Sequence, residues 1–296
     1  MTLSIDDVRA RLEANGHQIE SVEVINKADG IAAWQYDDSN LLEPKDIRQL
    51  KLLIFTPLHP NYGIKPQTLD SLQAAINQYD GPIDWLMSAN DNPSEKPYEN
   101  VVSQHNKARR IVLEQGYAAL LSIEADMIIP PDTVDQLLSV EADIVYGLYV
   151  WRHKPRRWNV YKSLNLWGGE SVSFNHNGQD AREAWGKVID VAGLGMGCTL
   201  IRKNVLNRFQ FRIHDGNPGW IADEYGDQFK TLGINPYRPH PNMVCDDWLL
   251  AMDAQHYQFS QKANLNIVCG HILGDEVIWP DPNVKDLYRI EQLEGV

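Results

Sequence analysis

Short apolar runs alternate with amphipathic stretches through the central part of the chain. The apolar runs are nearly continuous, as in strands buried on both faces of a parallel sheet, and they cover residues 51–57, 83–88, 118–123 and 142–149. Residues 66–79 and 100–115 lie between these runs and have helical spacing of their apolar positions. This alternation predicts an α/β fold with a mostly parallel, doubly wound sheet and helices on both faces.

The amino-terminal part of the chain has a different pattern. A helix start signal at Ser4 precedes an acidic turn, and residues 19–24 and 31–36 predict two short strands. We therefore expect a small α+β module over residues 1–48, followed by a main domain over residues 49–296.

Composition limits the classes of function. With 296 residues, 43% of them hydrophobic, the chain can bury a large core. Its net charge of −13 argues against broad binding to nucleic acid or anionic membrane, because such binding needs Lys and Arg. Three cysteines without CxxC spacing indicate neither a disulfide framework nor a structural zinc site. No apolar run reaches roughly 18 residues and no signal-peptide pattern is visible, so we expect a cytoplasmic protein of open oligomeric state.

Two carboxylates follow the third apolar run, in the tripeptide Glu124-Ala125-Asp126. In extended backbone, residues two apart point to the same side, so Glu124 and Asp126 converge where the strand ends. Open α/β sheets bind ligands at this edge, and Mg²⁺ or Mn²⁺ prefers carboxylates together with phosphate oxygens. The alternative interpretation is an acidic loop after a buried strand.

This region resembles the core of GT-A fold glycosyltransferases, family 2-like members of the nucleotide-diphospho-sugar transferase superfamily. The resemblance rests on Asn106-Lys107-Ala108-Arg109-Arg110, residues 116–127 and Pro131-Asp132-Thr133-Val134. In that superfamily a DxD-type motif holds the metal and the diphosphate of the donor. Here the motif is ExD, which puts more weight on Asp126 than on Glu124. The resemblance implies a GT-A fold, Mn²⁺ or Mg²⁺ as cofactor and a UDP- or GDP-sugar as donor.

The resemblance also implies which residues contact the donor: Thr56, Pro57, Asp91, Lys107, Arg109, Glu124, Ala125 and Asp126. Asp91 is equally consistent with a turn. Glycines alternate around Gly195, and this segment would line the sugar pocket, although a simple bulge or turn explains them as well.

The most basic segment of the chain contains Trp151, Arg152 and Trp158. Such a loop can fold over a diphosphate or an acceptor, with Arg neutralising charge and Trp stacking on an apolar sugar face. A solvated charged loop with one packed Trp is the alternative.

Two later segments resemble catalytic parts of the same superfamily. Asp246 and Asp247 resemble the helix start that carries the base in inverting members, and we favour Asp247 as base with Asp246 beside it. Adjacent acids can also simply cap a helix. His271, near the end of an apolar strand over residues 265–272, resembles a third metal contact beside Asp126 and Glu124; a structural histidine is the alternative.

The sequence thus predicts a metal-dependent, inverting glycosyltransferase that uses a nucleoside-diphosphate sugar and an unknown hydroxyl acceptor. Two other classes remain: a metal-dependent nucleotidyltransferase or hydrolase, and a non-catalytic nucleotide-sugar-binding protein. A nucleotidyltransferase would be expected to carry a Gly-rich basic loop after its first strand, and residues 56–63 lack one.

Overall fold

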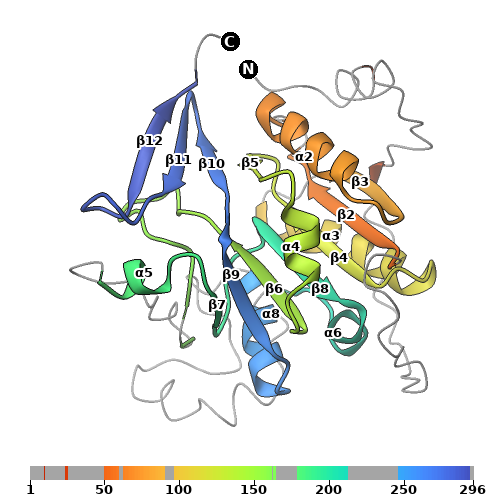
Figure 1. Ribbon diagram of the computed structural model, residues 1–296. Helices are drawn as coiled ribbons and strands as arrows, with labels where there is room; N and C mark the ends of the chain where they lie inside the picture. The colour runs from red at the N-terminus through yellow and green to blue at the C-terminus, as the bar shows by residue number, and fades with distance from the viewer. Residues whose placement is uncertain are drawn as a thin grey trace, which may run out of the picture.

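The computed structural model describes residues 10, 24–25, 50–59, 63–90, 97–161, 163–164, 179–212 and 246–293. The described strands form two sheets (Figure 1). The larger sheet has the spatial order β1 (Val24–Ile25), β3 (Ile83–Asn90), β2 (Leu52–Pro57), β4 (Ala119–Ile123), β8 (Cys198–Arg202), β6 (Ile144–Leu148), β9 (Gln261–Val268) and β7 (Val188–Asp190). The smaller sheet has the order β12 (Tyr288–Gln292), β11 (Glu276–Pro280), β10 (Gly270–Leu273) and β5 (Met127–Ile128).

Most of the larger sheet is parallel. Strands β1, β3, β2 and β4 run parallel to one another, and so do β6 and β9. Strand β8 is antiparallel to both β4 and β6, so these two strands share one direction. The carboxyl ends of β2, β4 and β6 therefore lie at the same edge of the sheet. The prediction of a mostly parallel α/β sheet is confirmed, whereas the antiparallel smaller sheet was not predicted.

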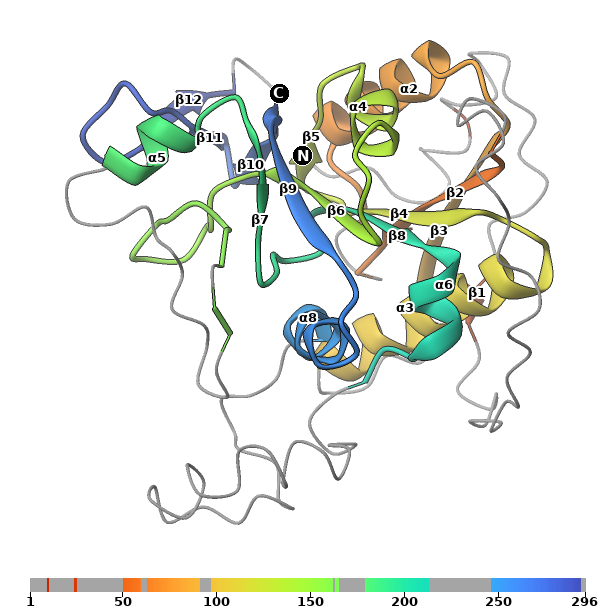
Figure 2. The ribbon, with the colours of Figure 1, turned by 60° about the horizontal axis from the view of Figure 1, so that its bottom comes forward.

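Helices cover both faces of the larger sheet (Figure 2). One face carries α2 (Pro66–Gln78) and α4 (Thr133–Leu138). The other face carries α3 (Pro97–Glu114), α6 (Lys203–Arg208) and α8 (Asp246–His256). Helix α5 (Gln179–Ala184) lies beside the smaller sheet. Among the described helices, none combines the length and the apolar composition needed to cross a bilayer.

Strand β2 shows why its sequence is continuously apolar. Leu52 and Ile54 pack into the core beneath α2 and α4, while Leu53 and Phe55 pack into the core beneath α3, α6 and α8. All four side chains are at most 2% exposed. Because successive residues of a strand point to opposite faces, a strand between two helical layers needs apolar residues at every position.

The predicted strand over residues 265–272 is two strands in the structure, and the prediction of a single strand was wrong. Strand β9 ends at Val268, where its pairing with β6 shifts register between Gly147 and Leu148. The Cys269 N–H donates to the Leu148 carbonyl at 2.8 Å, and β10 then enters the smaller sheet. His271 consequently lies inside β10 instead of following the last strand of the main sheet.

Most of the predicted amino-terminal module lies outside the described residues. Within it, Ala10 is helical and β1 pairs in parallel with β3, at the edge of the larger sheet. Of the three cysteines, Cys198 and Cys269 are buried free thiols, and Cys245 lies outside the described residues.

Candidate metal centre and active site

Glu124, Asp126 and His271 form a cluster in which one ligand atom from each residue lies within 4.8 Å of the other two. Glu124 and Asp126 follow β4, as the sequence predicts. His271 reaches them because β10 pairs with β5, which places His271 opposite Met127. The Ile272 N–H also donates to the Asp126 carbonyl at 2.8 Å. The cluster therefore stands at the carboxyl end of β4, where open α/β sheets bind ligands.

The imidazole of His271 has a fixed orientation. Its Nδ1 lies 2.8 Å from the Val150 carbonyl, which can only accept a hydrogen bond, so Nδ1 carries a proton. In the neutral ring, Nε2 then presents a lone pair. This atom is buried without a hydrogen-bond partner and lies 3.6 Å from Asp126 Oδ2. Two acceptors that face one another need a proton or a cation between them, and a carbonyl behind Nδ1 is the usual support for a metal-binding histidine.

Charge balance in the cluster depends on Arg152. Its Nη1 lies 2.5 Å from Asp126 Oδ2. Burial by itself would raise the pKa of Asp126, but the contact with His271 and the charge of Arg152 outweigh burial, so the pKa lies below the usual value. Burial likewise opposes protonation of His271, yet Asp126 raises the pKa of that imidazole above its usual value.

Glu124 has the opposite shift. Burial, followed by the negative charge of Asp126, raises the pKa of the Glu124 carboxyl. Two carboxylates that repel one another, together with an imidazole nitrogen, are a ligand set that fits a divalent cation such as Mn²⁺ or Mg²⁺. The cluster is thus able to hold a metal ion.

A second carboxylate site lies next to the metal cluster. Asp247, in the first turn of α8, accepts a hydrogen bond from the Trp248 N–H at 2.7 Å. Burial, followed by the charge of Asp246, raises the pKa of Asp247 to about 8, and Glu124 adds to this shift. Burial also raises the pKa of the Tyr149 hydroxyl, with further contributions from Glu124 and Asp247. Tyr149 therefore lies within the electric field of both sites, and its ring packs edge-on against His271 at 5.6 Å.

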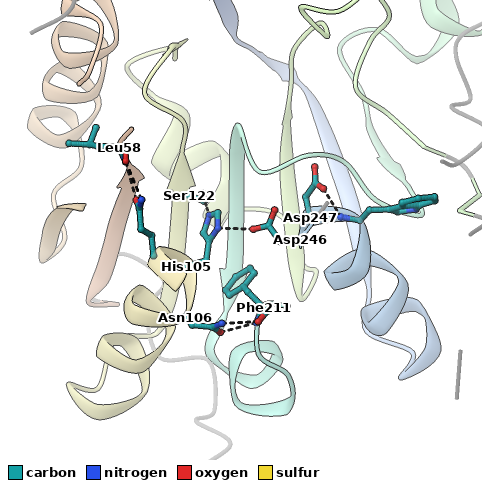
Figure 3. A network of polar contacts seen from close by, with 9 residues as sticks. Leu58, His105, Asn106, Ser122, Phe211, Asp246 and Asp247 are labelled. Carbon is teal, nitrogen blue, oxygen red and sulfur yellow. Dashed lines mark hydrogen bonds and ion pairs between the residues drawn. The ribbon is translucent and has the colours of Figure 1, made fainter. Parts of the chain in front are cut away.

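Asp246 is occupied by a different contact. Its Oδ2 lies 2.8 Å from His105 Nδ1, and His105 Nε2 lies 3.3 Å from Ser122 Oγ (Figure 3). His105 is on α3 and Ser122 is on β4, two residues before Glu124. The two neighbouring aspartates of α8 thus have different surroundings: Asp246 is held by a histidine, whereas Asp247 lies near Tyr149.

Other predicted donor contacts are distributed over the same edge of the sheet. Thr56 is fully buried, and its Oγ1 accepts a hydrogen bond from Trp85 Nε1 at 3.1 Å. Pro57 ends β2, and Ala125 lies half-buried between the two carboxylates. Gly195 is packed so tightly that a Cβ atom there would lie 3.0 Å from Asp247 Oδ2. Asp91 lies outside the described residues.

Of the two basic residues of α3 that the resemblance assigns to the donor, Arg109 connects α3 to α6 by hydrogen bonds. Arg109 Nε donates to the carbonyls of Leu206 and Phe209 at 2.6 and 2.7 Å, at the end of α6. Lys107 is half-buried on the same helix. Donor binding by Arg109 and Lys107 stays a prediction.

The two tryptophans of the loop after β6 differ in their exposure to solvent. Trp151 is 40% exposed, its Nε1 donates to Asn159 Oδ1 at 2.6 Å, and its ring lies 5.8 Å from that of Tyr161. Trp158 is only 3% exposed and donates to the Leu287 carbonyl at 2.5 Å. The structure therefore leaves Trp151 accessible to a ligand, while Trp158 matches the alternative of one packed Trp in a charged loop.

Sequence reasoning missed His105, Ser122 and Tyr149. A weak signal exists for Ser122, because Ser122, Glu124 and Asp126 alternate along one strand and its exit. His105 lies in a polar run, Gln104-His105-Asn106, on a helix that is otherwise amphipathic. Tyr149 has no local signal, since it reads as the last residue of an apolar strand.

Comparison with known proteins assigns no family, because no family model matches the chain and no curated protein matches it. Among solved structures, the chain is similar to A197 from STIV, at 16% identity and a TM-score of 0.48, over 83% of this chain and 96% of that one. It is also similar to a glycosyltransferase involved in glycosylation of the major capsid of PBCV-1, at 11% identity and a TM-score of 0.28, over 53% of this chain and 62% of that one. A third similar structure is the inositol-1-phosphate CTP transferase from T. maritima, at 10% identity and a TM-score of 0.36, over 76% of this chain and 89% of that one.

Proposed function

We propose that this protein is a metal-dependent glycosyltransferase of GT-A fold that transfers a sugar, with inversion, from a nucleoside-diphosphate donor to a hydroxyl acceptor. The observation that carries the proposal is the cluster of Glu124, Asp126 and His271 at the carboxyl end of β4. Carboxylate and imidazole ligands suit Mn²⁺ or Mg²⁺, and these ions also bind phosphate oxygens. A metal at this site would neutralise charge on a diphosphate leaving group.

The residues have separate roles in this proposal. Asp126 and His271 bind the metal directly, and Glu124 binds either the metal or a ribose hydroxyl. Arg152 supplies a further positive charge for the diphosphate, because a guanidinium pairs strongly with phosphate oxygens. Trp151 offers an exposed ring for an apolar sugar face.

Asp247 is the proposed general base. Inversion needs a carboxylate that takes the proton of the acceptor hydroxyl as its oxygen attacks the anomeric carbon, from the side opposite the leaving group. A base works best when its pKa is near the operating pH, and burial raises the pKa of Asp247 to about 8. Asp246 is less suited to this role because His105 already contacts its carboxylate.

Nucleotidyl transfer is the main competing function, since it uses the same metal and the same carboxylates. The two functions differ in the ligand that binds with the metal: a nucleoside diphosphate or its sugar conjugate in one case, a nucleoside triphosphate in the other. The sequence after the first strand of the main domain, residues 56–63, lacks the Gly-rich basic loop expected for a nucleotidyltransferase.

Calorimetry tests the proposal directly. UDP, GDP, their sugar conjugates, UTP and CTP are titrated into metal-free protein, with and without Mn²⁺. Metal-dependent binding of one diphosphate or its conjugate, lost in Asp126→Ala and in His271→Ala, is expected. His153→Ala is the matched control, because His153 is an exposed histidine on the loop after β6 and should leave binding unchanged. Binding of a triphosphate alone would support nucleotidyl transfer, and binding of no nucleotide would refute both functions.

A further inference from the structure

Three consecutive polar residues of α3 each contact a different part of the fold (Figure 3). Gln104 exchanges two hydrogen bonds with the backbone of Leu58, both at 3.1 Å. Asn106 exchanges two with the backbone of Phe211, at 2.7 and 2.9 Å. Successive residues of a helix point about 100° apart, so three neighbours can reach three segments. His105, the middle residue, is the one that reaches the candidate active site.

The imidazole of His105 has no freedom to turn. It is 1% exposed and lies between two aromatic rings, Phe55 at 5.2 Å and Phe211 at 4.8 Å. Its Nδ1 lies 2.8 Å from Asp246 Oδ2, an ion-pair contact in which the two buried atoms are not aligned as a hydrogen bond. The other ring nitrogen, Nε2, lies 3.3 Å from Ser122 Oγ, within hydrogen-bonding distance. The ring therefore connects β4, which leads to Glu124 and Asp126, with the first turn of α8.

We propose that His105 is a positioning residue, which fixes the first turn of α8 through Asp246 and so holds Asp247 in place to act on the acceptor. The inference rests on the proposed function. It adds a reason for two adjacent aspartates: Asp246 anchors the helix to His105, and Asp247 faces the reacting groups. Placement of a catalytic group must be accurate, because small displacements cost large factors in rate.

Two conservative variants separate the contacts of His105. In His105→Asn the side-chain amide occupies the position of Nδ1, so the contact with Asp246 is kept. In His105→Gln the amide reaches the position of Nε2, so only the contact with Ser122 is kept. Both variants lose the same aromatic packing between Phe55 and Phe211, which makes them matched controls for each other.

The first readout is hydrogen exchange of the metal-free protein, which needs no substrate. In His105→Gln, backbone amides in the first turn of α8 should exchange at least about tenfold faster than in His105→Asn, while those of β4 and β10 remain equal in the two variants. The second readout is transfer kinetics. His105→Gln should lower kcat by about tenfold or more with KM for the donor and affinity for Mn²⁺ unchanged, and His105→Asn should retain most of kcat.

Equal exchange in α8 for the two variants would overturn the inference, and so would an equal loss of kcat. A weaker affinity for Mn²⁺ in His105→Gln alone would also overturn the inference, because His105 would then act through β4 and the metal cluster instead of through α8. Failure of the proposed function looks different: the wild type would show no metal-dependent binding of a nucleoside diphosphate. In that case the exchange comparison decides the role of His105 by itself.

Discussion

Arg152 Nη1 lies 2.5 Å from Asp126 Oδ2, the same oxygen that faces His271 Nε2 at 3.6 Å. The Arg152 guanidinium thus occupies the carboxylate oxygen with which Asp126 would bind a metal ion. The Arg152 side chain is 42% exposed, so it can leave without unpacking the core. A divalent cation at Asp126 would repel Arg152, and a diphosphate bound to that cation would offer the guanidinium a new partner.

Replacing Arg152 should therefore affect metal and nucleotide binding in opposite directions. Without nucleotide, Arg152→Ala should bind Mn²⁺ about two- to fivefold more tightly, because a partly exposed ion pair contributes up to about 1 kcal/mol. With a nucleoside diphosphate present, the same variant should bind the nucleotide more weakly. Calorimetry at low ionic strength measures both, with Lys154→Ala as control for loss of one charge from this loop. Unchanged affinity for Mn²⁺ in Arg152→Ala would contradict the exchange of partners.

The part of the site that the sequence predicts is the part that local geometry determines. Glu124 and Asp126 follow a strand whose apolar run is unbroken, and a period of two residues is enough to place both carboxylates on one side. The alternation of strands and helices likewise predicts the two helical layers, because each depends on short-range patterns. These features needed no knowledge of which strands are neighbours.

The remaining features depend on contacts between distant segments. His271 reaches Asp126 only through the pairing of β10 with β5, and the break at Cys269 that starts β10 has no Pro or turn signal before it. His105 meets Asp246 only once α3 and α8 pack on the same face of the sheet. Sequence patterns identify faces of elements but not their partners across the fold, so the strand over residues 265–272 was predicted as one and the role of His105 was missed.

Asp247 should make the metal-free protein less stable as the pH rises. Its pKa is about 8 in the folded protein and 3.8 for an ordinary aspartate, as in the unfolded chain. The folded protein therefore keeps a proton that the unfolded chain loses. The stability associated with that proton is complete below about pH 4 and is lost as the pH rises to about 8. Asp247→Asn removes this loss, because an asparagine side chain does not titrate. Each unit of pKa difference between the folded and unfolded states corresponds to about 1.4 kcal/mol in the free energy of unfolding. Its Tm in EDTA should therefore exceed that of the wild type at pH 8 and match it at pH 4.

Asp246→Ala provides the contrast for this prediction. Removal of that carboxylate leaves His105 Nδ1 buried without its partner, which costs about 1–3 kcal/mol. This variant should have a lower Tm at every pH at which the protein folds. A Tm of Asp247→Asn that stays below the wild-type value at pH 8 would show that burial of Asp247 does not raise its pKa.

Gln104 should stabilise the exit of β2, where donor contacts are predicted. It is 2% exposed and satisfies both the N–H and the carbonyl of Leu58. Gln104→Met keeps the length of the side chain but leaves the Leu58 carbonyl buried without this partner, at a cost of about 1–3 kcal/mol, whereas the Leu58 N–H keeps its hydrogen bond to the Ser88 carbonyl at 2.7 Å. Urea unfolding should show a lower midpoint with an unchanged slope. Gln73→Met, a partly exposed Gln on α2, is the comparison for general effects of the substitution.

Gly195 is required for space beside the proposed base. A Cβ atom at this position would lie 2.4 Å from Tyr149 Oη, 2.8 Å from Asn159 Nδ2 and 3.0 Å from Asp247 Oδ2, so at least one of these groups must move in Gly195→Ala. Overpacking of this kind costs typically about 1–3 kcal/mol, and displacement of Asp247 should lower kcat by at least about tenfold. Gly116→Ala is the matched control: its φ of +76° makes the substitution strained, but a Cβ there meets nothing within 4 Å. We expect comparable losses of Tm in the two variants and a loss of kcat only in Gly195→Ala. Equal kcat in the two variants would place Asp247 outside the reaction.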